Sequence, residues 1–211
     1  VAGDSRSSLL LSLGADAWHQ AGFRGRGVTV AVLDIGFRGY TNSLGVTLPR
    51  SIHAKSFRLD GNIEARKSQH GVVCGEIVHA IAPDADILFV DWQPDSRESF
   101  LAAVDWAKRN GAKVITCSVV MPAWSDGDGG GPTHHALNTI VGDGMLRVAC
   151  AGNLAKRHWA GDFRPDTAGW HRWPNGSIDN VVTPWGDDVV SLELSSSGQT
   201  FEVYAFDEGG K

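Results

Sequence analysis

Four polar side chains have the types and the sequence positions that acyl transfer requires: Asp34, His70, Ser118 and Asn153. Asp34, Ser118 and Asn153 follow apolar segments of strand length, and His70 begins a segment with helical periodicity. An aspartate can orient a histidine, and the histidine can take a proton from a nucleophile and return it to the leaving group. A side-chain amide can donate to the oxyanion of a tetrahedral intermediate. Asp34, His70 and Asn153 therefore predict an acyl-transfer site, with Ser118 nearby.

Structural explanations for these residues remain open beside the chemical one. Asp34 can cap the turn that follows its strand through backbone N–H groups. His70 can be a helix N-cap residue, and Asn153 can occupy a left-handed turn after Gly152. A residue can have both roles at once.

The elements that must position these side chains alternate between strand and helix over most of the chain. Strands are predicted at 28–33, near 54–57, and at 87–90, 114–117 and 146–150. Helices are predicted at 14–22, from His70 to Pro83, from a cap at Asp95 or Ser96 to Asn110, and at 132–141. This order is typical of an α/β fold with a parallel sheet covered by helices on both faces. Ligands bind such sheets beyond the carboxyl ends of the strands, where the four side chains are expected.

The motifs around these residues resemble those of the subtilases, the subtilisin-like serine peptidases. The resemblance rests on V-A-V-L-D-I-G at 30–36, H-G-V-V-C-G-E-I at 70–77 with A-P-D-A at 82–85, V-I-T-C-S at 114–118, and A-G-N at 151–153. They occur in the family's order and cover roughly residues 14–163. The resemblance implies that Asp34 and His70 belong to an Asp-His-Ser triad, that Asn153 is the oxyanion amide, and that Ser118 lines the substrate cleft.

Three departures from the family pattern stand out. Ile35 replaces the usual Ser or Thr after the aspartate, and Val72 replaces the usual Thr two residues after the histidine. The nucleophile's Gly-Thr-Ser-x-x-x-Pro motif occurs nowhere in the 211 residues. The serine-rich segment 195–198 lies in strand-and-turn patterning without the Thr or the Pro, and we interpret it as a turn.

The resemblance implies a serine endopeptidase acting on polypeptide substrates. Because the nucleophilic serine is missing, we expect the 211-residue chain to be inactive by itself and to be the first part of a longer peptidase. The alternative is a catalytically inactive, subtilase-like pseudopeptidase or peptide-binding module. A nucleotide-binding function is disfavoured, because the glycines of 25–27 precede the first strand instead of following it.

Two domains are predicted from a change of pattern near residue 163. Residues 1–163 are expected to form the α/β domain. Residues 164–211 carry eight acidic and three basic side chains, and thus the whole net charge of −5. Alternating apolar and polar residues at 181–206 predict antiparallel strands, which resemble part of a β-sandwich insertion found in some subtilases.

Composition limits the classes of partner. A sequence pI near 5.9 argues against nucleic-acid binding by bulk charge. No apolar run of about 18 residues is present, so no membrane span is expected. The oligomeric state stays open. Secretion is expected from the family resemblance, because most bacterial and archaeal subtilases act outside the cytoplasm.

No cofactor or metal is predicted at a particular position. His134 and His135 lie near Asp126 and Asp128, but this segment lacks the remaining ligands of a calcium loop. Structural calcium is common in subtilases, although no calcium position can be transferred to this chain.

The cysteines and the late tryptophans are expected to have structural roles. Each of the three cysteines lies in an apolar run, which favours buried thiols; they are Cys74, Cys117 and Cys150. The tryptophans at 159, 170, 173 and 185 favour packing over a carbohydrate-binding platform.

Overall fold

The computed structural model describes residue 8 and residues 10–121, 124, 129–152, 159–182 and 200–206 of the chain. The chain forms two compact units, Val1–Arg157 and His158–Lys211. The domain boundary predicted near residue 163 stays a prediction.

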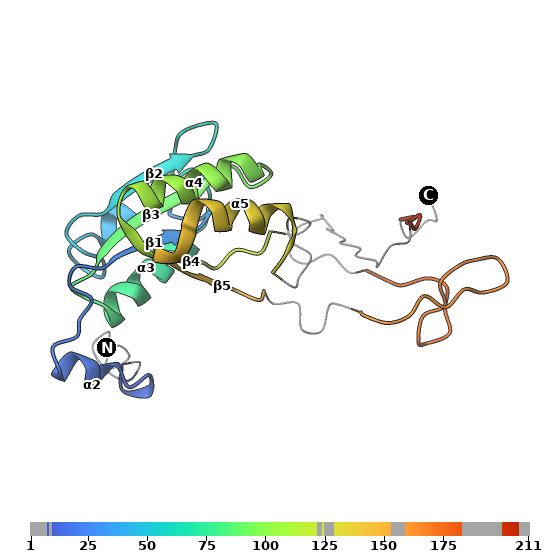
Figure 1. Cartoon of the computed structure of the whole chain (residues 1–211), viewed down its shortest axis with the longest axis horizontal. Helices are drawn as coiled ribbons and strands as arrows, with labels where there is room; N and C mark the ends of the chain where they lie inside the picture. The colour runs from blue at the N-terminus through green and yellow to red at the C-terminus, as the bar shows by residue number, and fades with distance from the viewer. Residues whose placement is uncertain are drawn as a thin grey trace. The chain divides into compact units, whose positions relative to one another are not determined.

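The first unit contains a five-stranded sheet in which all neighbouring strands are parallel (Figure 1). The strand order is β2-β3-β1-β4-β5. The strands are β1 (Thr29–Leu33), β2 (His53–Phe57), β3 (Asp86–Trp92), β4 (Ala112–Cys117) and β5 (Leu146–Ala149). This sheet, with its helices, confirms the predicted α/β fold.

The helices also follow the predicted order. Among the described residues they are α2 (Ala15–Gln20), α3 (His70–Ile81), α4 (Arg97–Arg109) and α5 (Gly131–Val141), with short 3-10 helices at Tyr40–Ser43 and Gly142–Gly144. Ser96 is the N-cap of α4, where its side chain accepts a hydrogen bond from the backbone N–H of Ser99. Pro132 lies in the first turn of α5, where its missing N–H costs no helical hydrogen bond.

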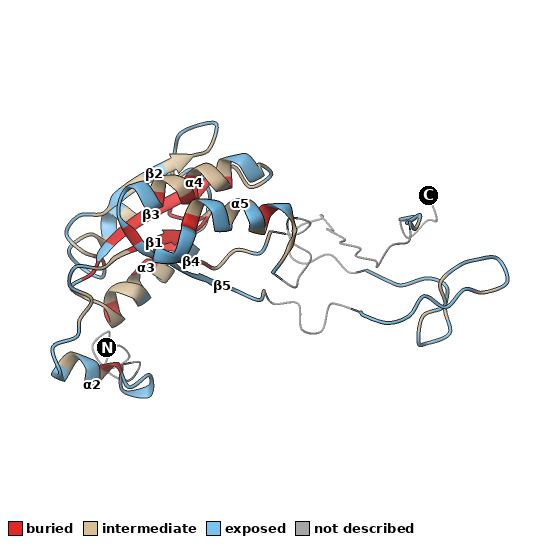
Figure 2. Ribbon diagram, viewed as in Figure 1, coloured by how far each residue is buried: buried red, intermediate tan, exposed pale blue. Residues whose placement is uncertain are grey.

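Both faces of the central strand β1 are covered, which explains its continuous apolar sequence. Val32 packs with Phe37 and Phe89 in a core cluster that includes Val72 of α3. Leu33 belongs to a second cluster, which contains buried residues of α4 and α5. Figure 2 shows this burial concentrated in the sheet and on the helix faces beside it.

Helix α3 packs against the sheet through small residues. Gly71, Val72, Gly75 and Ala80 are its buried positions. A Cβ atom at Gly75 would collide with the ring of Phe89, so glycine allows the helix to approach the sheet closely. The helical spacing of Val73 and Ile77 predicts α3, but these two residues do not form its buried face. Their side chains are 50% and 45% exposed.

The second unit contains aromatic packing and little regular secondary structure among its described residues. Pro165 and His171 form an isolated antiparallel bridge. The ring centroid of Trp159 is 4.8 Å from that of His171 and 5.2 Å from that of Trp173, in line with a packing role.

The antiparallel strands predicted at 181–206 are tested only in part. No strand is assigned at 181–182 or 200–206. The rest of the prediction, with Trp185 and the serine-rich segment 195–198, lies outside the described residues.

Within the described part of the chain, no helix is both long enough and apolar enough to cross a membrane.

Candidate active site

Asp34 is held rigidly at the carboxyl end of the central strand. Its side chain is 1% exposed, and its backbone N–H donates to the carbonyl of Val90 at 3.1 Å. Its Oδ1 accepts the backbone N–H groups of Ile35 at 2.8 Å and Gly36 at 3.0 Å. Asp34 therefore caps the turn after β1, as the structural interpretation proposed, while Oδ2 remains available for another partner.

That partner is His70, the first residue of α3. His70 Nδ1 lies 2.6 Å from Asp34 Oδ2, within hydrogen-bond distance. An ionised carboxylate can only accept, so opposite one the donor is the Nδ1–H of the ring, and in a neutral imidazole Nε2 then carries the lone pair. The His70 side chain is 54% exposed. A half-exposed imidazole whose Nε2 can accept a proton has the form required of a general base.

Gly71 explains how helix and strand come this close. Its backbone N–H donates to the carbonyl of Gly36 at 2.8 Å. A Cβ atom at Gly71 would lie 2.6 Å from Phe37 Cε1 and 2.7 Å from Asp34 Cβ. The His-Gly pair therefore combines a chemical group with the space needed to place it.

Ser118 lies at the same edge of the sheet. It follows Cys117, which is the register partner of Leu33, so Ser118 and Asp34 leave neighbouring strands at the same level. Its side chain interacts with the thiol of Cys74 on α3. Cys74 Sγ is 4.0 Å from His70 Nδ1. Three of the four residues predicted from the sequence thus gather at one edge, and Asn153 lies outside the described residues.

The three cysteines differ in burial, which corrects part of the sequence-based prediction. Cys117 is buried, and burial raises the pKa of its thiol to about 12. Cys74 is half-buried; burial and the nearby Asp34 carboxylate raise its pKa. Cys150 is exposed, so the prediction of a buried thiol is wrong there. Its position after the fully exposed edge strand β5 explains the exposure.

One group of side chains in the described residues could hold a metal ion: Asp34, His70 and Cys74. Sequence reasoning did not select Cys74, although its spacing of four residues from His70 places both on one side of α3. The metal candidates Asp126 and Asp128 lie outside the described residues. His134 Nδ1 donates to the carbonyl of Gly130 at 2.7 Å.

Asp91 is a second buried carboxylate that sequence reasoning missed. It is 0% exposed, and no hydrogen bond of ordinary geometry reaches either of its oxygens, although the Ser56 side chain and the Phe57 backbone lie close enough to lower its pKa. Burial raises its pKa to about 6, although Ser56, opposite it on β2, and Arg58 lower the pKa in part. Since burial opposes its ionisation more than these neighbours favour it, the buried Asp91 carboxylate is a cost to stability where it is ionised.

Comparison with known proteins identifies the family. The subtilase family, peptidase family S8, matches residues 25–178. No curated protein gives a match. Among solved structures, the chain is similar to MycP1 with its N-terminal propeptide removed, at 23% identity and a TM-score of 0.46, covering 69% of this chain and 48% of that chain. The chain thus spans about half the length of that structure. Because the family match includes most of its residues, the chain belongs to the subtilase family.

Proposed function

We propose that this chain supplies the aspartate and histidine of a serine endopeptidase that hydrolyses polypeptides. The observation that carries the proposal is the 2.6 Å contact between Asp34 Oδ2 and His70 Nδ1. This contact fixes the tautomer that general-base catalysis needs, and it lies at the sheet edge where α/β proteins bind ligands.

In this proposal, His70 Nε2 accepts the hydroxyl proton of a serine as the serine oxygen attacks the scissile carbonyl. Asp34 stabilises the resulting imidazolium and keeps the ring oriented. His70 then returns the proton to the amine as the C–N bond breaks, which leaves an acyl-enzyme for water to hydrolyse. Asn153 would donate to the oxyanion of each tetrahedral intermediate, and Ser118 would line the substrate cleft.

In this proposal the nucleophile lies outside these 211 residues, because no Gly-Thr-Ser-x-x-x-Pro motif occurs in them. The same observation favours a second candidate, a pseudopeptidase or peptide-binding module that keeps the cleft without the reaction. The two candidates differ in what the gene encodes beyond Lys211. A serine motif there supports the peptidase, and a stop codon supports the binding module.

The steps assigned to Asp34 and His70 use proton transfer and need no cofactor. Structural calcium, as in other subtilases, would act on stability away from these steps. The protein would act outside the cytoplasm, as most bacterial and archaeal subtilases do.

A fluorophosphonate probe, which reacts with activated serines, tests the proposal. The 211-residue chain should remain unlabelled, since loss of the triad serine lowers kcat by about 10⁶-fold. A gene product extended through a serine motif should become labelled. His70→Ala should abolish that labelling, and His135→Ala, which removes an exposed histidine of α5, should not. Labelling that survives His70→Ala would refute the proposed role of His70.

A further inference from the structure

Three kinds of metal-binding atom converge at the Asp34–His70 pair. Asp34 Oδ2, His70 Nδ1 and Cys74 Sγ all lie within 4.8 Å of one another. Asp34 follows β1, and the other two residues occupy adjacent turns of α3. The close packing of α3 on the strand end, through Gly71, therefore brings a carboxylate, an imidazole and a thiol to one point.

We propose that Asp34, His70 and Cys74 form a binding site for Zn²⁺ that switches the Asp–His pair off. A mixed O, N and S ligand set matches zinc, which takes carboxylate, imidazole and thiolate ligands. Ca²⁺ and Mg²⁺ prefer oxygen ligands, so the thiol and the imidazole select against them. Three protein ligands leave the fourth tetrahedral position for water.

Small movements convert the present arrangement into a tetrahedral site. Zinc bonds of about 2.0–2.3 Å place tetrahedral ligand atoms roughly 3.3–3.6 Å apart. His70 Nδ1 is 2.6 Å from Asp34 Oδ2 and 4.0 Å from Cys74 Sγ. To reach tetrahedral distances, the His70 ring must move away from the Asp34 carboxylate, and the Cys74 thiol must rotate toward the metal position. Each movement is about an ångström. The His70 side chain is 54% exposed, which leaves it room to move, whereas the buried Asp34 stays fixed.

Zinc would compete directly with the hydrogen bond on which catalysis depends. His70 binds the metal through Nδ1, so its remaining proton must reside on Nε2. The Cys74 thiol gives up its proton, and the ring stays neutral, so one proton is released for each Zn²⁺ bound. With Nε2 protonated, His70 cannot accept a proton from a serine. This inhibitory consequence rests on the proposed function, whereas metal binding itself does not.

Titration of the 211-residue chain with Co²⁺, and competition with Zn²⁺, tests the site without any catalytic activity. A Co²⁺–thiolate charge-transfer band should appear and should disappear when Zn²⁺ is added. Cys74→Ala and Cys74→Ser should each abolish the band and weaken Zn²⁺ binding by more than about 100-fold. Losing a residue that only orients a metal ligand weakens binding by up to about 100-fold, so loss of a ligand itself should cost more. The serine variant preserves the shape of the side chain if the alanine variant fails to fold.

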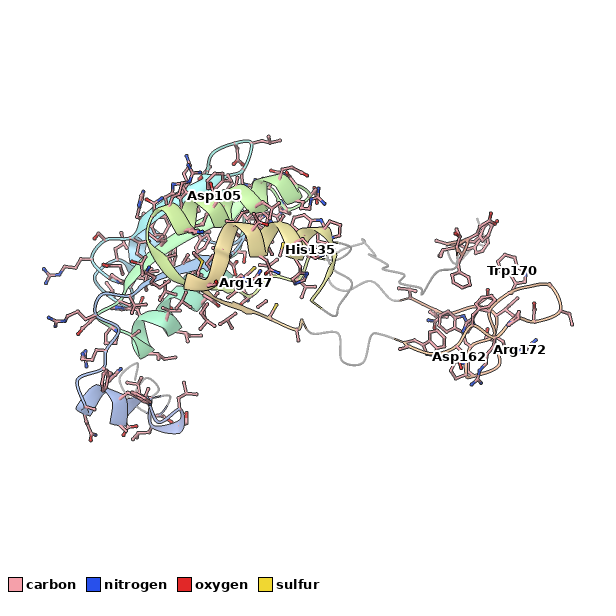
Figure 3. All side chains as sticks on the ribbon, viewed as in Figure 1. Asp105, His135, Arg147, Asp162, Trp170 and Arg172 are labelled. Atoms are coloured by element: carbon pink, nitrogen blue, oxygen red, sulfur yellow. The ribbon has the colours of Figure 1, made fainter. Side chains whose placement is uncertain are left out.

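Two matched variants separate this site from its neighbours. Cys150→Ser removes the exposed thiol after β5, and His135→Ala removes the exposed histidine labelled on α5 in Figure 3. Both variants should bind Zn²⁺ as the wild type does. In ¹⁵N NMR spectra, Zn²⁺ should move the His70 proton from Nδ1 to Nε2.

Three results would overturn the inference. One is a thiolate band that persists in Cys74→Ser, and the second is a band that is lost in Cys150→Ser. The third is Zn²⁺ binding that leaves the Nδ1 proton of His70 in place. Failure of fluorophosphonate labelling in an extended gene product would instead count against the peptidase function, because metal binding would be unaffected.

Discussion

His70 lies 36 residues after Asp34 in the chain, yet its Nδ1 is 2.6 Å from the Asp34 carboxylate. The contact joins the turn after the central strand to the first residue of α3. Backbone N–H groups hold the other carboxylate oxygen, so the aspartate orients the histidine from a fixed position.

Gly71→Ala should destabilise the fold, because its new methyl group would lie 2.6 Å from Phe37 Cε1 and 2.7 Å from Asp34 Cβ. Crowding of this kind typically costs about 1–3 kcal/mol. Gly144→Ala is the matched control, since a Cβ atom there has no neighbour within 4 Å. Urea unfolding measures both variants. Equal stability of the two would show that α3 does not pack on the strand end as described.

Val72→Ala and Val73→Ala test which face of α3 is buried. Val72 is 4% exposed and Val73 is 50% exposed. Removing the buried valine side chain should lower the free energy of unfolding by about 2 kcal/mol more than removing its neighbour. The gain in helix propensity is the same in both variants, so it cancels. A larger loss of unfolding free energy in Val73→Ala than in Val72→Ala would show that the opposite face of α3 is buried.

Asp91→Asn should stabilise the chain relative to the wild type more at pH 7.5 than at pH 3.5. Burial raises the Asp91 pKa from 3.8 to about 6, so the folded state binds this proton more tightly than the unfolded state. Wild-type stability therefore falls as the pH rises from about 3.8 to about 6. The full loss above that range is roughly 3 kcal/mol.

Urea unfolding at both pH values measures this difference for Asp91→Asn. Asp86→Asn, at an exposed position of the same strand, is the control for general effects of pH and charge. An Asp91→Asn effect independent of pH would mean that Asp91 is already ionised without cost in the folded chain.

Much of the fold could be predicted because β1, β3 and β4 have apolar runs of strand length. The pairing of Asp34 with His70 was predictable as well, since one follows a strand and the other begins a helix. The buried face of α3 was not predictable, because the glycines that allow close packing do not contribute to hydrophobic periodicity. The exposure of Cys150 and the burial of Asp91 depend on strand order, which local sequence does not specify. Cys150 follows the edge strand β5, and Asp91 lies on β3, inside the sheet.

The tautomer of His70 tests the central claim most directly, and ¹⁵N NMR of the 211-residue chain at neutral pH, with metal chelated, can measure it. The wild type should carry its ring proton on Nδ1, donated to Asp34. In Asp34→Asn, the new amide should donate to Nδ1 and move the proton to Nε2, the change that lowers kcat about 10⁴-fold in serine peptidase triads. The exposed His135 should show no change between the two proteins. A wild-type ring protonated mainly on Nε2, or one that Asp34→Asn leaves unaltered, would contradict the assignment of Asp34 and His70 as a catalytic pair.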